Sequence, residues 1–66
     1  MIITVNGEAA HVVDGTTLQS VVASFRLPDT GVALALNGAV VPRSAWPTTE
    51  LSDDAQVEVI TAMQGG

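Results

Sequence analysis

The sequence predicts an α+β fold in which one helix covers one face of a single mixed β-sheet. Two Asn-Gly pairs, Asn6-Gly7 and Asn37-Gly38, each lie between apolar segments, which is typical of β-hairpins. A stretch with helical spacing of apolar residues separates the two hairpins, and an apolar, strand-like segment follows the second one. The predicted order is therefore ββαβββ, and one helix can cover only one face of such a sheet.

Composition limits the chain to one small domain with an aliphatic core. The 66 residues are 47% hydrophobic but include only one Phe and one Trp. The absence of cysteine excludes a disulfide scaffold and a thiolate zinc site, and a single histidine cannot form a metal site alone. A net charge of −5, with two arginines and no lysine, excludes a nucleic-acid binder and favours docking on a basic protein surface.

No apolar run is long enough to span a membrane, and the apolar residues 1–5 are too few for a signal peptide. We therefore expect no membrane association and a cytoplasmic location.

Residues 1–5 and 8–13 are expected to form the first hairpin. Residues 1–5 are aliphatic and β-branched, and Asn6-Gly7 tolerates the positive φ angles of a type I′ turn. His11 lies in the returning strand. We expect an exposed polar side chain there and not a catalytic one, because no Ser, Cys or acidic residue is placed to partner it.

The helix is expected to begin after Asp14-Gly15 and to end before Pro28, a length of about two and a half turns. Thr16 as N-cap, with Gln19 three residues later, fits a capping box. The spacing i, i+3, i+4, i+7 gives one apolar stripe and predicts core positions for Leu18, Val21, Val22 and Phe25. So short a helix is unstable alone in water, so the stripe must pack on the sheet.

Residues 32–36 and 39–41 are expected to form the second hairpin, closed by Pro42. In its first strand the larger Leu34 and Leu36 are predicted to face the core. Ala33 and Ala35 then form a flat surface of small residues on the opposite face.

Two prolines bracket residues 42–47, which predicts a 3₁₀ or irregular segment. We expect the Trp46 ring to lie over an edge of the core, with a partner contact as the alternative. Arg43 is a candidate for a salt bridge or a partner contact, and Leu51 for a buried anchor in a polar loop.

Residues 56–62 are predicted to form the last strand, so that residues 1–62 make the folded domain and residues 63–66 a flexible tail. The strand is apolar on both faces, which suits the centre of the sheet. Ile60 then lies on the face without the helix, beside the two alanines. An exposed apolar patch marks a partner site, so we expect Ile60 and Ala35 to bind a partner.

The chain ends in Met63-Gln64-Gly65-Gly66, whose last two residues have no side chains. An inert, flexible end is one interpretation. The other is that the terminal carboxylate is the reactive group, because a thread without Cβ atoms can enter a narrow channel and reach a nucleotide phosphate. With no cysteine and no lysine, the carboxyl terminus is the evident reactive group of the chain.

Residues 33–46, ALALNGAVVPRSAW, resemble the ALAxNGxVVPRxxW stretch of the ThiS family of thiamine-biosynthesis sulfur carriers. These proteins have the ubiquitin-like β-grasp fold. The length and residues 61–66 are similar as well, so the resemblance covers the whole chain. Ser52-Asp53-Asp54 departs from it, since many members have an Asp-Gly-Asp turn there.

The resemblance implies a carrier that partner enzymes act on, and not an enzyme. An E1-like enzyme resembling ThiF would use ATP and magnesium to join the Gly66 carboxylate to AMP. Sulfur from a cysteine desulfurase would displace AMP, and the thiocarboxylate would donate its sulfur to a thiazole synthase resembling ThiG. Gly65, Gln64 and Met63 would enter the partner's active site. The chain itself would hold no cofactor or metal and be a monomer on its own.

Three alternatives stay open. The first is the small subunit of molybdopterin synthase, which shares the chemistry but is usually longer and has a Pro-containing approach to Gly-Gly. The second is a ubiquitin-like modifier, although the absence of lysine excludes one that builds chains on itself. The third is a β-grasp binding module with an inert tail.

Overall fold

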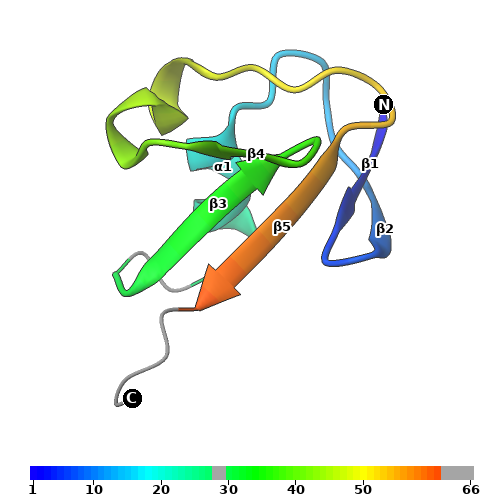
Figure 1. Ribbon diagram of the computed structural model, residues 1–66. Coiled ribbons are helices and arrows are strands. Elements are labelled where there is room, and N and C mark those ends of the chain that lie inside the picture. The colour runs from blue at the N-terminus through cyan, green and yellow to red at the C-terminus, as the bar shows by residue number, and fades with distance from the viewer. Residues whose placement is uncertain (28–29, 62–66) are drawn as a thin grey trace.

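A computed structural model describes residues 1–27 and 30–61, in which one helix packs on one face of a five-stranded sheet (Figure 1). The elements follow the predicted order ββαβββ, with one 3₁₀ helix before the last strand. They are β1 (Ile2–Val5), β2 (Glu8–His11), α1 (Leu18–Ser24), β3 (Val32–Leu36), β4 (Ala39–Val41), η1 (Arg43–Thr48) and β5 (Gln56–Thr61).

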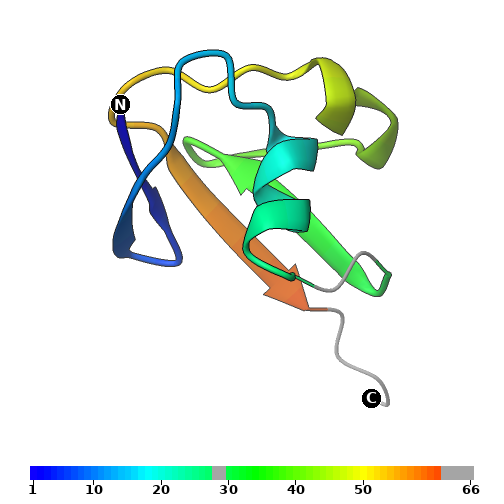
Figure 2. The ribbon, with the colours of Figure 1, turned by 180° about the vertical axis from the view of Figure 1, so that it is seen from behind.

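The sheet has the strand order β2-β1-β5-β3-β4, with β5 at its centre as predicted. β1 and β5 are parallel, whereas the other neighbouring strands are antiparallel, so the sheet is mixed. Figure 2 shows α1 crossing in front of the sheet when the molecule is seen from behind. No helix in the described ranges is long and apolar enough to cross a membrane.

Both Asn-Gly pairs form the predicted tight turns. The φ angles are 52° and 85° at Asn6-Gly7 and 51° and 88° at Asn37-Gly38, as a type I′ turn requires. The first hairpin is shorter than expected, because β2 ends at His11 and Val13 is exposed outside the sheet.

The asparagine side chains of these two turns also hold the central strand. The Val59 N–H donates a hydrogen bond to Asn6 Oδ1 (2.8 Å), and the Gln56 N–H donates one to Asn37 Oδ1 (2.9 Å). Asn6 follows β1 and Asn37 follows β3. Each side chain therefore bonds to a residue of β5 that lies past the last residue paired with its own strand.

The helix begins one residue later than the capping-box prediction. Thr17, not Thr16, is the N-cap: its backbone is extended and its Oγ1 accepts a hydrogen bond from the Ser20 N–H (3.2 Å). The Thr16 hydroxyl donates instead to the carbonyl of Val13 (2.7 Å). A start at Leu18 places that fully buried side chain in the first turn of the helix.

The prediction that Phe25 lies in the core is wrong. The helix ends at Ser24, and Phe25 is its C-cap, with a side chain 38% exposed. The chain then turns through Arg26, whose φ is 55°, and Leu27 packs against the core in place of the phenylalanine.

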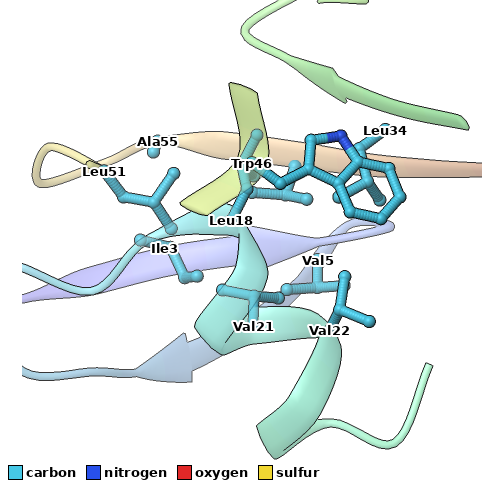
Figure 3. Packing of buried hydrophobic residues seen from close by; sticks show 10 residues of the cluster. Ile3, Val5, Leu18, Val21, Val22, Leu34, Trp46, Leu51 and Ala55 are labelled. Atoms are coloured by element: carbon cyan, nitrogen blue, oxygen red, sulfur yellow. The ribbon is translucent and has the colours of Figure 1, made fainter. Parts of the chain in front are cut away.

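The core lies between α1, η1 and the covered face of the sheet (Figure 3). Trp46 belongs to it: the side chain is 2% exposed, and its Nε1–H donates to the carbonyl of Val41 (3.0 Å). It therefore lies deeper than the predicted position over a core edge, and no surface remains for the alternative of a partner contact. Leu51 is buried, as predicted. The cluster consists of Ile3, Val5, Leu18, Val21, Val22, Leu34, Trp46, Leu51, Ala55 and Val57.

Candidate functional site

The sheet face opposite α1 carries Ile60, the residue predicted to bind a partner. In β5, Val57 and Val59 pack toward the core, so Glu58 and Ile60 point to the other face. Ile60 lies directly opposite Ala33 of β3 and is 47% exposed, which confirms the predicted exposure.

Ala35 does not present the exposed surface expected of it. It lies outside the core cluster, yet only 4% of the residue is exposed. Val40 of β4 and Glu58 of β5 lie directly opposite it on either side. Side chains in such pairs have Cβ atoms about 5 Å apart, so the two larger neighbours cover the alanine methyl group.

Val40 is a surface residue that the sequence interpretation missed. It is 64% exposed and shares the open face with Ala35, its partner across the second hairpin. The two-residue turn at Asn37-Gly38 fixes this register, so the signal was present in the sequence. We define the open-face patch as Ala33, Ala35, Val40, Glu58 and Ile60.

One end of the open-face patch opens into a shallow depression that is lined in part by the positively charged Arg43. Six residues line the depression: Thr30, Gly31, Val32, Ala33, Arg43 and Ile60. The Arg43 guanidinium carbon lies 5.1 Å from the centroid of the Trp46 ring, a cation–π distance. The exposed Arg43 is thus held against a buried ring while it borders the surface of Ile60.

The predicted reactive end lies outside the described residues. The structure describes β5 as far as Thr61, so Met63, Gln64, Gly65 and Gly66, and the assignment of residues 63–66 as a flexible tail, stay predictions. His11 is exposed in β2, as expected. In residues 1–27 and 30–61, no group of three or more His, Cys, Asp or Glu side chains is arranged to hold a metal ion.

The arrangement of the elements defines the class of protein. One helix packed on a mixed five-stranded sheet, with β1 and β5 parallel at its centre, is the predicted ubiquitin-like β-grasp fold. A family model described as "ThiS family" matches residues 3–66. The chain belongs to the ThiS family.

Two solved structures from Geobacter metallireducens are similar to the chain over its full length. The first is a crystal structure of the thiamine biosynthesis protein ThiS, with a TM-score of 0.87, 29% sequence identity and coverage of 100% of both chains. The second is an NMR solution structure of a thiamine biosynthesis protein, with a TM-score of 0.75, 29% identity and coverage of 100% of this chain and 88% of that one. A comparison with curated proteins gives no match.

Membership of the ThiS family supports the predicted role of a small sulfur carrier in thiamine biosynthesis. The same two findings agree with the quoted resemblance of residues 33–46, which led to this family from sequence alone.

Proposed function

We propose that this protein carries sulfur as a thiocarboxylate on Gly66 and delivers it for synthesis of the thiazole ring of thiamine. The observation that carries the proposal is the family match, which extends from residue 3 to the terminal Gly66. Gly65 and Gly66 supply a thread without Cβ atoms, which fits a narrow active-site channel.

The carboxylate of Gly66 needs activation because it is a poor acyl donor. One of its oxygens attacks the α-phosphorus of ATP, pyrophosphate leaves, and a mixed anhydride with AMP forms. The outer sulfur of a cysteine persulfide charged by the desulfurase then attacks the carbonyl carbon, AMP leaves with one of the original carboxylate oxygens, and an acyl disulfide forms. A second thiol attacks the inner sulfur of the former persulfide, so that a disulfide forms and the thiocarboxylate on Gly66 is released. The net change on the carrier is the exchange of one oxygen for one sulfur.

The catalytic groups for this chemistry belong to partner proteins. An E1-like enzyme resembling ThiF binds ATP and magnesium and stabilises the charge on the phosphates. A cysteine desulfurase provides the sulfur, and a thiazole synthase resembling ThiG accepts it. We assign the exchange to the cytoplasm. The carrier contributes its terminal carboxylate and a surface for docking.

The length of the tail requires docking close to the end of β5. Residues 62–66 follow Thr61, and five residues span at most about 17 Å when fully extended. The reacting phosphorus must therefore come within roughly that distance of Thr61. Ile60, exposed one residue before Thr61, is well placed to contact the activating enzyme.

The intact mass of the carrier tests the proposed function. The protein is incubated with ATP, magnesium, cysteine, an E1-like activating enzyme and a cysteine desulfurase. We expect a mass gain equal to the difference between sulfur and oxygen, and no gain in a variant that lacks Gly66. Addition of a thiazole synthase together with the carbon substrates that accept the sulfur should return the mass of the carrier to its starting value. No gain, with an enzyme mixture active on another carrier, would refute the proposal.

A further inference from the structure

The open-face patch has a diagonal arrangement of apolar and charged residues. Glu58, Ala35 and Val40 form one row across β5, β3 and β4. Ile60 and Ala33 form the next row, which Arg43 continues at the shallow depression. Ile60 and Val40, the exposed apolar side chains, thus lie at opposite corners of the area formed by the open-face patch and Arg43. The charged Glu58 and Arg43 lie at the other two corners.

The positive corner is fixed in position. The Arg43 guanidinium lies over the Trp46 ring, and Trp46 is itself buried and hydrogen-bonded to Val41. A long side chain loses conformational entropy when a partner orders it, so one that is already held loses less on binding. The guanidinium is therefore prepared to meet a carboxylate.

Positive charge is scarce on this protein. The sequence has two arginines, Arg26 and Arg43, and no lysine, and its formal net charge is −5. Arg26 follows α1, on the side of the sheet that the helix covers, whereas Arg43 borders the open-face patch. The acidic overall charge favours a partner surface that is mostly basic. An acidic side chain on that surface would need a cation of the carrier opposite it, and Arg43 borders the open-face patch where it can provide one.

We infer that the open-face patch fixes the orientation in which the activating enzyme binds the carrier. Arg43 faces an acidic side chain of the enzyme, Glu58 faces a basic one, and Val40 and Ile60 enter an apolar cleft between them. A rotated complex would bring like charges together, and their repulsion disfavours it. It would also move the end of β5 away from an active site that the tail can reach.

This inference rests on the proposed function, and steady-state ATP–pyrophosphate exchange tests both separately. The assay measures adenylation at Gly66 as a function of carrier concentration. In Arg43→Glu the KM for the carrier should rise about tenfold or more, because a like-charge contact replaces an attractive one, while kcat stays close to that of the parent protein. Arg26→Glu is the matched control, since it lowers the net charge by the same amount.

A charge exchange separates partner contacts from a pair within the carrier. If Arg43 and Glu58 acted mainly on each other, the double variant Arg43→Glu/Glu58→Arg would recover the parent KM. If each faces a partner charge, the double variant should have a higher KM than either single variant. Arg43→Lys keeps the positive charge and should recover most of the affinity, even if Arg43→Glu weakens the fold.

Three results have distinct meanings. No exchange with the parent protein would refute the proposed function. Exchange with the parent protein, but equal KM values for Arg43→Glu and Arg26→Glu, would overturn the orientation inference alone, as would recovery in the double variant. A selective KM effect of Arg43→Glu that disappears at high salt supports the inference, because salt screens exposed charge pairs.

Discussion

The two faces of the sheet are built from the same strands but differ in the size and exposure of their side chains. The covered face presents Leu34 and Val57 to the buried Trp46, and each of these residues is at most 2% exposed. The open face presents the small Ala33 and Ala35 between corners formed by larger residues. Because side chains alternate along a strand, β3 and β5 contribute to stability on one face and leave the other open to the partner that we propose.

The largest loss of stability is expected from Trp46→Ala, on the covered face. Removal of this buried ring should cost about 3–5 kcal/mol of unfolding free energy, a large part of the roughly 5–15 kcal/mol available to a small domain. Urea unfolding followed by circular dichroism measures the change. Trp46→Phe keeps most of the ring and should lose less. A cost of less than about 1 kcal/mol for the alanine variant would mean that the core collapses around the missing ring.

Leu34 and Ala35 allow the two faces to be compared at adjacent positions. Leu34→Ala should cost about 2–5 kcal/mol, because it leaves a cavity in the core. Ala35→Leu adds volume on the open face, between the exposed Val40 and Glu58, which can move outward into solvent. It should cost about 1 kcal/mol, the low end of the range for added volume, while it raises the KM for adenylation. Thermal unfolding and pyrophosphate exchange test the pair. Equal destabilisation by both variants would contradict the separation of the two faces.

A smaller effect is expected at the start of the helix that creates the covered face. Thr17→Ala removes the acceptor for the Ser20 N–H and should cost about 1 kcal/mol. Thr17→Ser keeps the hydroxyl and should retain most of the stability. Thr16→Ala is the comparison, since the capping-box pattern assigned the N-cap to Thr16. A larger loss for Thr16→Ala than for Thr17→Ala would restore that assignment.

The smallest change in stability, with the largest change in function, is expected for Ile60→Asp on the open face. Because the side chain is half-exposed, the substitution should change the free energy of unfolding by no more than about 0.5 kcal/mol, as is usual at surface positions. The new charge would be desolvated in an apolar cleft, so the KM for adenylation should rise strongly. Unchanged adenylation kinetics in a folded Ile60→Asp protein would remove Ile60 from the docking surface.

Local signals in the sequence were enough for most of the fold. The Asn-Gly pairs set both turns because they permit positive φ at two successive residues. The apolar character of residues 56–62 on both faces predicted a central position for the last strand, and β5 does lie at the centre of the sheet. The motif at residues 33–46 and the Gly-Gly end led to the correct family.

The errors came where the outcome depended on neighbours distant in sequence or on a single backbone angle. Phe25 continues the apolar periodicity, but the helix stops one residue before it and the chain turns at Arg26. Ala35 does face away from the core, but its burial depends on Val40 and Glu58 beside it. The strand pattern gives the face of a residue, and only the pairing gives its cover.

The hydrogen bonding on both sides of β5 has a mechanical consequence. β1 and the Asn6 side chain hold one edge of this strand, and β3 holds the other edge along five paired residues. Inter-strand hydrogen bonds lie across the strand direction, so tension applied at the carboxyl end loads many of them together in shear. In the proposed function, a partner that binds Gly66 therefore pulls on a strand that is hydrogen-bonded along both edges. Such tension should move the domain as a unit and not unravel it from that end.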